Sequence, residues 1–369
     1  MTVFINNHTT KENGNGFYIL DLIDKLNLES TKIISLSCKT KNKKYKVFTL
    51  KNKKKSKNFL GKILEIISMN YLILKNINEI KNETIVFTSD PPMVGIILIL
   101  ISKLFKVNLI LWCQDIFPNT LTVSGILKRS SIFFLLLKYM NKFIYENVNR
   151  IVTISNSMKT TLIKDYKIKS NKIILIENWH SLCFKKTTLI KNNKINIFYI
   201  GNISLVHDEL FVIDFINQIN NKDLNFKIFT NSEKVKNKFN KRLLNIGFLS
   251  NNLFHRYLSI SDFQMVFSKP GALNYVYPSK IYNILYSKKP IIYFNKNDND
   301  EVSKFLNKYQ IGININNKNK KKFINLFSNT KKIKSLIKLY KKNYKKLSSL
   351  EREKNISITK WKDVIKCVE

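Results

Sequence analysis

The chain has 369 residues, a length that favours two domains over a single core. Hydrophobic residues make up 44% of it and aromatic residues 12%, which argues against an intrinsically disordered protein despite a formal net charge of +39. The four cysteines are scattered without a Cys-x-x-Cys pair, and no histidines cluster at metal spacing, so the sequence predicts neither a disulfide framework nor a zinc site.

The positive charge is carried almost entirely by lysine. Only five of the 64 basic residues are arginine, and lysine, asparagine and isoleucine are all abundant, which is the bias of an AT-rich genome. Two stretches, 30–64 and 302–350, contain many lysines and no acidic residue. We consider three explanations for the positive charge, in descending order of preference: genome bias, attraction to an anionic membrane surface, and nucleic-acid binding. The scarcity of arginine and of known binding motifs counts against nucleic acid.

The N-terminus lacks the basic region and long apolar core of a signal peptide. The most apolar segments, Pro91 to Phe105 and Ile132 to Tyr145, are interrupted by polar residues and fall short of the ~20 residues needed to cross a bilayer. Either segment is suited to lie on a membrane. We therefore expect a cytoplasmic protein, peripheral on the inner face of the plasma membrane if it binds lipid.

Short β-rich apolar runs alternate with helical patterns over the first half of the chain, which is typical of parallel sheets with crossover helices. The predicted strands are 2–7, 32–37, 45–49, 84–88, 107–113, 150–154 and 172–176. The predicted helices include 15–26, 58–78, 92–105, 130–147 and 156–164.

A polar, lysine-rich segment, 185–194, has no apolar periodicity and is the predicted linker. The alternation then restarts, with strands at 195–200, 225–230, 244–248, 262–267, 290–294 and 311–315, helices at 208–220, 279–287 and 301–308, and a helical tail at 331–366. We predict an α/β protein of two doubly wound Rossmann-like domains facing a cleft. The acceptor domain is 1–185, the nucleotide-sugar domain is 186–350, and the C-terminal helix 351–369 packs back on the first domain.

The segment 278–292 is predicted to be a helix whose start holds an anion. Pro278 and Ser279 are helix-start signals, and serine is able to cap free backbone N–H groups. Lys280 then falls in the first turn, where the helix dipole disfavours a cation. A lysine at that point makes sense if a phosphate is bound there, held by the N–H groups and the ammonium together. A surface lysine in a lysine-rich chain is the equal alternative.

Glycines follow the first strand of each predicted domain. Gly14 and Gly16 open the first helix, where they permit a tight turn and close approach of the backbone to an anion or a sugar. A plain turn explains them equally well. Gly201 and Asn202 occupy the corresponding position in the second domain, where glycine lets a ligand approach the backbone.

Acidic residues follow two central strands. Asp115 comes directly after 107–113, on the expected rim of the cleft, where a carboxylate binds hydroxyls or takes a proton. Its alternative role is to cap the turn before Pro118. For Asp90, after 84–88, helix capping is the stronger interpretation. His8 follows the first strand and is suited to face the cleft, whereas a turn or surface role is expected for His180, His207 and His255.

An ordered set of motifs now resembles a known family. These motifs are Asp90 to Gly95, Leu111 to Pro118, Arg150 to Ser155, Ile176 to Trp179, Tyr199 to Ile203 and Pro278 to Asn283. Together they resemble the bacterial retaining glycosyltransferases of GT-B fold, the family 4-like group with the colanic-acid and O-antigen enzymes, over residues 84 to 315.

The resemblance implies a nucleotide-sugar donor on the second domain, an acceptor on the first, and no required metal. The implied donor-binding residues are Gly201, Asn202, Ser279, Lys280 and Asn283. Lys280 would replace magnesium at the diphosphate. Asn283 stands where many relatives have a glutamate that binds ribose hydroxyls, the partner glutamate is not recognisable, and the basic residue common after Gly201 is missing. Gly14 and Gly16 would form an acceptor or phosphate loop, and Asp115 is the candidate catalytic residue.

We therefore expect a retaining glycosyltransferase that moves a hexosyl or N-acetylaminosugar unit from a nucleotide-diphosphate donor to a lipid-linked or oligosaccharide acceptor in surface polysaccharide (O-antigen or capsule) assembly. One alternative is a nucleotide-sugar epimerase of the same fold, which would need acidic residues in the donor site, where this chain is short of them. The other is a basic nucleic-acid-binding protein, whose affinity would fall steeply with salt.

Overall fold

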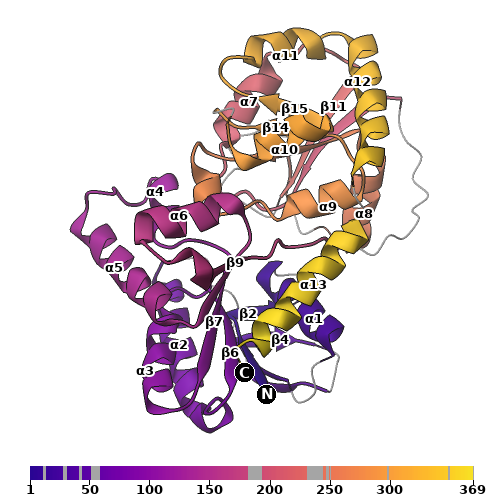
Figure 1. Ribbon diagram of the computed structural model, residues 1–369. Coiled ribbons are helices and arrows are strands. Elements are labelled where there is room, and N and C mark those ends of the chain that lie inside the picture. The colour runs from indigo at the N-terminus through magenta and orange to yellow at the C-terminus, as the bar shows by residue number, and fades with distance from the viewer. Residues whose placement is uncertain are drawn as a thin grey trace. The chain divides into compact units, whose positions relative to one another are not determined.

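The computed structural model describes residues 1–10, 14–27, 31–40, 44–50, 59–181, 193–230, 244–246, 249, 251–296, 299–347 and 350–368 (Figure 1). The predicted domain boundary at 185/186 and most of the predicted linker lie outside these residues. The described chain forms two compact units. Unit 1 comprises 1–179, 274–277 and 353–369, and unit 2 comprises 180–273 and 278–352.

The core of unit 1 is a seven-stranded, all-parallel sheet. Its order is β5 (Lys46–Phe48), β3 (Lys32–Ile34), β1 (Thr2–Ile5), β6 (Thr84–Thr88), β7 (Asn108–Cys113), β8 (Arg150–Thr153) and β9 (Ile173–Leu175). The central strands β1 and β6 are buried at every position, as expected for a sheet covered on both faces. A separate two-stranded ladder joins β2 (His8–Thr10) to β4 (Ser37–Lys39).

Helices cover both faces of this sheet. Its helical elements are α1 (Gly14–Leu26), α2 (Phe59–Lys75), η1 (Ile77–Glu79), α3 (Val94–Leu104), α4 (Asn119–Val123), α5 (Ile132–Asn147), α6 (Asn156–Tyr166), η2 (Ser170–Lys172) and α13 (Leu350–Lys366). Helices α2, α3 and α5 lie together on one side in Figure 1, and α1 and α13 lie on the other. From α13, the buried Trp361 packs against Trp112 of β7 with ring centroids 4.4 Å apart, so the C-terminal end of the chain belongs to the core of unit 1.

Unit 2 repeats the architecture with a six-stranded parallel sheet. Its order is β12 (Leu244–Ile246), β11 (Leu224–Thr230), β10 (Ile195–Ile200), β13 (Phe263–Phe267), β14 (Ile291–Phe294) and β15 (Gly312–Ile315). The helical elements between and after these strands are α7 (Glu209–Asn217), α8 (Asn251–Ile260), η4 (Ala272–Asn274), α9 (Lys280–Tyr286), α10 (Glu301–Tyr309), α11 (Lys320–Phe327), α12 (Thr330–Asn343) and η5 (Tyr344–Lys346).

Both sheets have the strand order of a doubly wound fold, so the predicted fold class is confirmed. In each, the first strand of the unit lies in the middle and the chain winds outward in both directions. The first predicted strand, 2–7, ends earlier in the structure, since β1 stops at Ile5, and the separate strand β2 begins at His8, beyond the predicted range. The predicted helix 331–366 is divided into α12, η5 and α13. Strand and helix existence was thus predicted more accurately than element boundaries.

Candidate functional sites in the two units

Each doubly wound sheet has a switch point, where the strand order reverses and ligands bind beyond the carboxyl ends of the strands. In unit 2 the switch point lies between β10 and β13. Gly201 directly follows β10, and α9 lies downstream of β13. The structure brings Gly201 and Lys280 together at this point, since a Cβ atom built on Gly201 would lie 3.2 Å from Lys280 Nζ.

Gly201 is required here for two reasons. Its φ of +145° lies in the region that residues with a side chain rarely adopt. A side chain would also crowd the Lys280 ammonium, which lies 3.2 Å from the Cβ position, whereas the Tyr199 hydroxyl at 4.0 Å is at ordinary van der Waals distance. The Gly201 N–H donates to Phe229 O at 2.9 Å, which fixes the loop to β11.

The Lys280 ammonium is buried without a polar partner. Nζ has no hydrogen-bond acceptor among the described residues, and the ion pairs found there include none to Lys280. It lies 3.5 Å from the centre of the Tyr199 ring, a cation–π contact. Burial lowers the pKa of Lys280 well below its usual range because the charged form loses its hydration. An anion arriving at this nitrogen would supply the missing partner.

Tyr199 links the lysine to the glycine loop. It is fully buried on β10, and its hydroxyl donates to Asn202 O at 2.8 Å, which holds the loop after Gly201 in place. Burial raises the pKa of Tyr199, so the phenol stays neutral and keeps donating this bond. Asn202 itself is exposed, with its side chain available to a ligand.

His207 joins this cluster, although the sequence suggested only a turn or surface role. Its Nδ1 accepts from Ser204 N–H at 3.0 Å, which leaves the ring proton on Nε2. Its ring lies edge-on to Phe267, with centroids 5.4 Å apart. Burial, reinforced by the nearby Lys280 charge, lowers the pKa of His207 to about 3. His207 is therefore neutral, with an N–H donor at Nε2.

The two remaining predicted donor residues have defined contacts. Asn283 Oδ1 accepts from Ser181 N–H at 2.8 Å, and its Nδ2 donates to Ser181 Oγ at 3.0 Å. Asn283 thus holds the chain at Ser181. Ser279 precedes α9, but its φ and ψ of −54° and −23° are helical, and its side chain makes no capping bond to the described helix. The expectation that Ser279 caps the helix was wrong, because a capping hydroxyl needs an extended backbone to reach the N–H groups.

In unit 1, Asp115 lies just beyond the carboxyl end of β7. Its N–H donates to Ser89 Oγ at 3.1 Å, and it forms an isolated antiparallel bridge with Val276. The next residue, Ile116, donates its N–H to Tyr275 O at 2.8 Å. The short return of the chain at 274–277 therefore fixes the backbone that carries the Asp115 carboxylate.

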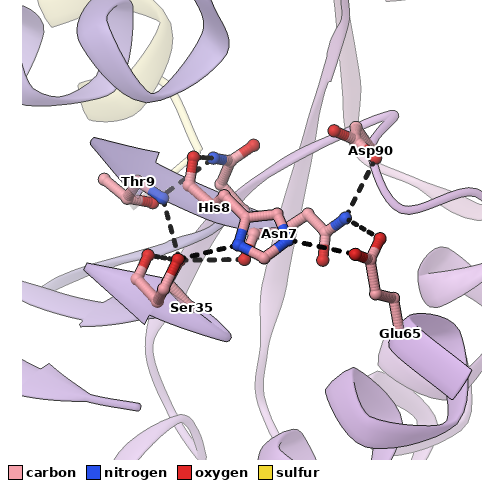
Figure 2. Close-up of polar contacts among 8 residues, drawn as sticks. Asn7, His8, Thr9, Ser35, Glu65 and Asp90 are labelled. Carbon is pink, nitrogen blue, oxygen red and sulfur yellow. Dashed lines mark hydrogen bonds and ion pairs between the residues drawn. The ribbon is translucent and has the colours of Figure 1, made fainter. Parts of the chain in front are cut away.

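A buried polar cluster that the sequence largely missed lies at the switch point of unit 1, between β1 and β6 (Figure 2). His8 Nε2 lies 3.3 Å from Glu65 Oε1, and His8 Nδ1 lies 2.7 Å from Ser37 Oγ. Asn7 Nδ2 donates to Glu65 Oε2 at 2.9 Å and contacts Asp90 Oδ1 at 3.4 Å. His8 was expected to face the cleft, whereas it is almost fully buried between these groups.

Asp90 was expected to cap a helix, which was wrong. Met93 occupies the cap position of α3, and the Asp90 carbonyl accepts from Asn7 N–H and from the Thr88 hydroxyl. The two proline peptides after Asp90 and after Phe117 are cis.

The two glycines of the first loop differ in role. A Cβ atom on Gly16 would lie 2.4 Å from Thr10 N, so glycine is required for α1 to pack against the backbone of β2. Gly14 is exposed and has no described atom within 4 Å of its Cβ position, which leaves it open to a ligand.

Among the described residues, no three His, Cys, Asp or Glu side chains are grouped closely enough to hold a metal ion. Within the same residues, none of the helices combines the length and the apolar character needed to span a bilayer.

Comparison with known proteins supports the fold and suggests an activity. No protein-family model matches the chain. A 70-residue stretch is 34% identical to a probable glycosyltransferase, WbjE, of Pseudomonas aeruginosa, and it spans 19% of this chain and 17% of that protein. This match covers a minor part of either protein.

Solved structures match the whole described architecture. WaaG, a glycosyltransferase involved in lipopolysaccharide biosynthesis, has a TM-score of 0.70 at 9% identity, over 97% of this chain and 98% of WaaG. HepE of Anabaena, solved with UDP, has a TM-score of 0.63 at 9% identity, over 97% and 98% of the two chains. A glycosyltransferase of Rickettsia africae has a TM-score of 0.58 at 14% identity, over 100% and 98%. The chain therefore has the two-domain fold of the GT-B glycosyltransferases.

Proposed function

We propose that this protein is a glycosyltransferase of surface polysaccharide biosynthesis that binds a nucleotide-diphosphate sugar on unit 2. The observation that carries the proposal is Lys280, a buried ammonium without a hydrogen-bond acceptor among the described residues, beneath Gly201 at the switch point of the sheet. The fold shared with WaaG and HepE and the partial match to WbjE support this function.

The donor diphosphate is the anion that we assign to this lysine. Burying an unpaired ammonium costs free energy, and a phosphate oxygen within hydrogen-bonding distance offsets that cost. The open backbone of Gly201 lets the diphosphate approach the loop, and the N–H groups near Ser279 add further donors. His207, neutral and protonated on Nε2, supplies a hydrogen bond in place of the missing basic residue. Because HepE was solved with UDP, UDP is the first nucleotide to test here.

In the proposed reaction, the bond between the anomeric carbon and the β-phosphate oxygen breaks and negative charge grows on the diphosphate. Lys280 stabilises that charge, which lowers the barrier because its partner becomes more anionic in the transition state. The acceptor hydroxyl forms the new bond on the same face of the sugar, with retention, and its proton passes to the departing phosphate oxygen. Lys280 thereby takes the role that a divalent metal has in other transferases, so we propose a metal-independent enzyme.

Unit 1 is assigned to the acceptor, a lipid-linked or oligosaccharide hydroxyl compound. Asp115, anchored through Ser89 and the strand bridge at Val276, orients a hydroxyl of the acceptor or the sugar. Gly14, exposed at the start of α1, is the part of the first glycine loop that is open to contact a ligand. We place the protein in the cytoplasm, where nucleotide sugars are made.

The proposal is tested by thermal-shift measurements with UDP, GDP and ADP and with their sugars, since a ligand that binds only the folded state raises the melting temperature. We expect at least one nucleotide diphosphate to raise it, and mass spectrometry to show sugar transfer from the matching donor. The absence of any shift would contradict the donor site.

The same experiment separates the alternatives. An epimerase would convert the donor into a second nucleotide sugar without an acceptor, and mass spectrometry would show no acceptor that carries an added sugar. A nucleic-acid-binding protein retains RNA or DNA on a filter at low salt and loses it at high salt. Neither result is expected.

A further inference from the structure

Residues 274–277, which we call the strap, belong to unit 1, although the chain on either side of them belongs to unit 2. The strap leads from the end of η4 towards α9, the helix that begins at Lys280. Tyr275 is 3% exposed within the hydrophobic core of unit 1, and Tyr277 packs against the same core. Because burial of aromatic rings is favourable, these two side chains hold the strap on unit 1.

The strap meets the end of β7 through its backbone. Val276 forms the isolated antiparallel bridge with Asp115, and Ile116 donates its N–H to Tyr275 O at 2.8 Å. A second anchor comes from within the sheet, since Ser89 Oγ accepts from Asp115 N–H at 3.1 Å. The backbone that carries the Asp115 carboxylate is therefore fixed by two anchors, and the strap is one of them.

The side chain of Tyr275 is fastened by Arg129. The Arg129 guanidinium donates a hydrogen bond to the Tyr275 hydroxyl. Its central carbon lies 5.7 Å from the centre of the Tyr275 ring, so the cation also contacts the aromatic face. Arg129 is exposed, whereas Tyr275 is buried. The arginine thus holds the one polar atom of an otherwise apolar, buried side chain.

The turn that carries Arg129 is itself fixed. Ser131, the cap residue of α5, accepts from Phe134 N–H at 3.2 Å. The Ser131 hydroxyl also donates to Lys128 O at 2.9 Å, which closes the turn around Arg129. A defined turn lowers the conformational entropy that Arg129 loses when it binds Tyr275. Contacts therefore run without a break from the start of α5, through Arg129 and Tyr275, to the backbone of Asp115.

We propose that Arg129 and Tyr275 are positioning residues for the transfer reaction, which act by holding the strap against Asp115. This inference rests on the function proposed above, in which Asp115 orients a hydroxyl of the acceptor or of the sugar. Small displacements of a group that orients a reactant cost rate, so a looser strap slows transfer without removing any ligand contact. The strap also ends three residues before Lys280, so one short segment anchors Asp115 and leads into the donor helix.

The first test needs no ligand. Tyr275→Phe keeps the buried ring and removes the hydroxyl, and Arg129→Gln removes the guanidinium. In hydrogen exchange of the full chain followed by mass spectrometry, the Ile116 N–H should exchange about fivefold faster in either variant, and peptides of unit 2 should be unchanged. Arg129→Lys keeps a charged donor and should exchange more slowly than Arg129→Gln. Wild-type exchange at Ile116 in both Tyr275→Phe and Arg129→Gln overturns the inference.

The second test separates positioning from a merely structural role. Release of UDP is measured from UDP-glucose, UDP-galactose and UDP-N-acetylglucosamine, with octyl β-glucoside as the acceptor. Tyr275→Phe should lower kcat roughly fivefold and leave the Kd of UDP unchanged. In an Asp115→Asn background the same change should cause no further loss, because Tyr275 acts through Asp115. A further fivefold loss in that background overturns the inference.

Matched controls change the same side-chain types nearby. Tyr139, which is 72% exposed, gives Tyr139→Phe, and the exposed Lys128 gives Lys128→Gln. Both should match the wild type in exchange at Ile116 and in kcat, and equal losses in these controls would overturn the inference. A wild type that releases no UDP contradicts the proposed function. Transfer by the wild type with unaltered exchange at Ile116 in the Arg129 and Tyr275 variants contradicts the positioning role alone.

Discussion

The Lys280 ammonium lies 3.5 Å from the centre of the Tyr199 ring and 3.2 Å from the position that a Cβ atom on Gly201 would occupy. The aromatic face compensates only part of the hydration that the cation loses, since an exposed cation–π contact contributes about 0.5–1 kcal/mol and a desolvated one about 2 kcal/mol or more. The ligand-free protein therefore keeps a poorly solvated charge at the place where a diphosphate is expected.

The variant Lys280→Met is predicted to stabilise the ligand-free protein. Methionine keeps much of the side-chain length against Tyr199 and removes a buried charge, so we expect a gain on the order of 1 kcal/mol and a melting temperature higher by a few degrees. Denaturation at several pH values provides the check. The pKa of Lys280 is lowered in the folded state, so the unfolded state binds more protons between that value and the ordinary lysine pKa.

The wild type should consequently gain stability relative to Lys280→Met as the pH rises from the lowered pKa of Lys280 to the ordinary lysine pKa. Below the lowered pKa, the difference in the free energy of unfolding between the two proteins should be constant. A destabilised Lys280→Met variant at neutral pH would show that the lysine is a structural residue of unit 2.

The variant His207→Asn is predicted to reduce the acid sensitivity of unit 2. The pKa of His207 is lowered from 6.5 to about 3, so below about pH 6.5 the unfolded chain takes up a proton that the folded chain refuses. The wild type should lose stability as the pH falls from about 6.5 toward 3, and the variant should lose less. Asparagine still accepts from Ser204 N–H through its side-chain oxygen. Urea denaturation at pH 7 and pH 4.5 measures the difference, and equal losses in both proteins would contradict the assignment.

Gly16→Ala and Gly14→Ala are predicted to differ sharply in stability. The alanine Cβ at 16 would meet Thr10 N at 2.4 Å, a backbone atom that moves only with the strand, so we expect a loss of about 3 kcal/mol. At 14 no described atom lies within 4 Å, so the stability should be nearly unchanged. Chemical denaturation of both variants tests this, and a stable Gly16→Ala protein would refute the packing argument. Loss of transfer activity in a stable Gly14→Ala protein would support a ligand role for that glycine.

Asn283 is predicted to act partly through Ser181. If its main role is to hold the chain there, Asn283→Ala, which removes both hydrogen bonds, should weaken nucleotide binding, and Ser181→Ala, which removes only the bond to Ser181 Oγ and keeps the backbone N–H bond, should weaken it less. If Asn283 also contacts the ribose, the gap between the two variants should widen by a further ~1 kcal/mol, or about fivefold in Kd. Binding of UDP compared with uracil and with pyrophosphate identifies which part of the ligand is affected.

Residue patterns along single elements predicted the fold well. The apolar run at 107–113 and the polar break after it placed β7 and Asp115, and the restart of the strand and helix alternation after 185–194 predicted two doubly wound sheets. The lysine at 280 was recognised because it opposes a helix dipole, while its grouping with Gly201 was implied only by the family resemblance.

The remaining features depend on contacts between distant segments. Glu65 lies on α2 among apolar residues, and only the packing of α2 against β2 reveals that its carboxylate meets His8. The β2 and β4 ladder has three residues in each strand, too few for a periodic signal. The wrong expectation for Ser279 arose because the identity of a residue does not determine its φ and ψ.

Titration calorimetry with UDP, or with whichever nucleotide diphosphate gives the largest thermal shift, tests the central claim most directly. The proteins to compare are the wild type, Lys280→Met and Lys288→Gln, since Lys288 is an exposed lysine two residues beyond the same helix. The donor site described above predicts binding about tenfold to hundredfold weaker in Lys280→Met, the range for a hydrogen bond to a charged group, and unchanged binding in Lys288→Gln. Wild-type affinity in Lys280→Met would contradict the assignment of Lys280 to the donor diphosphate.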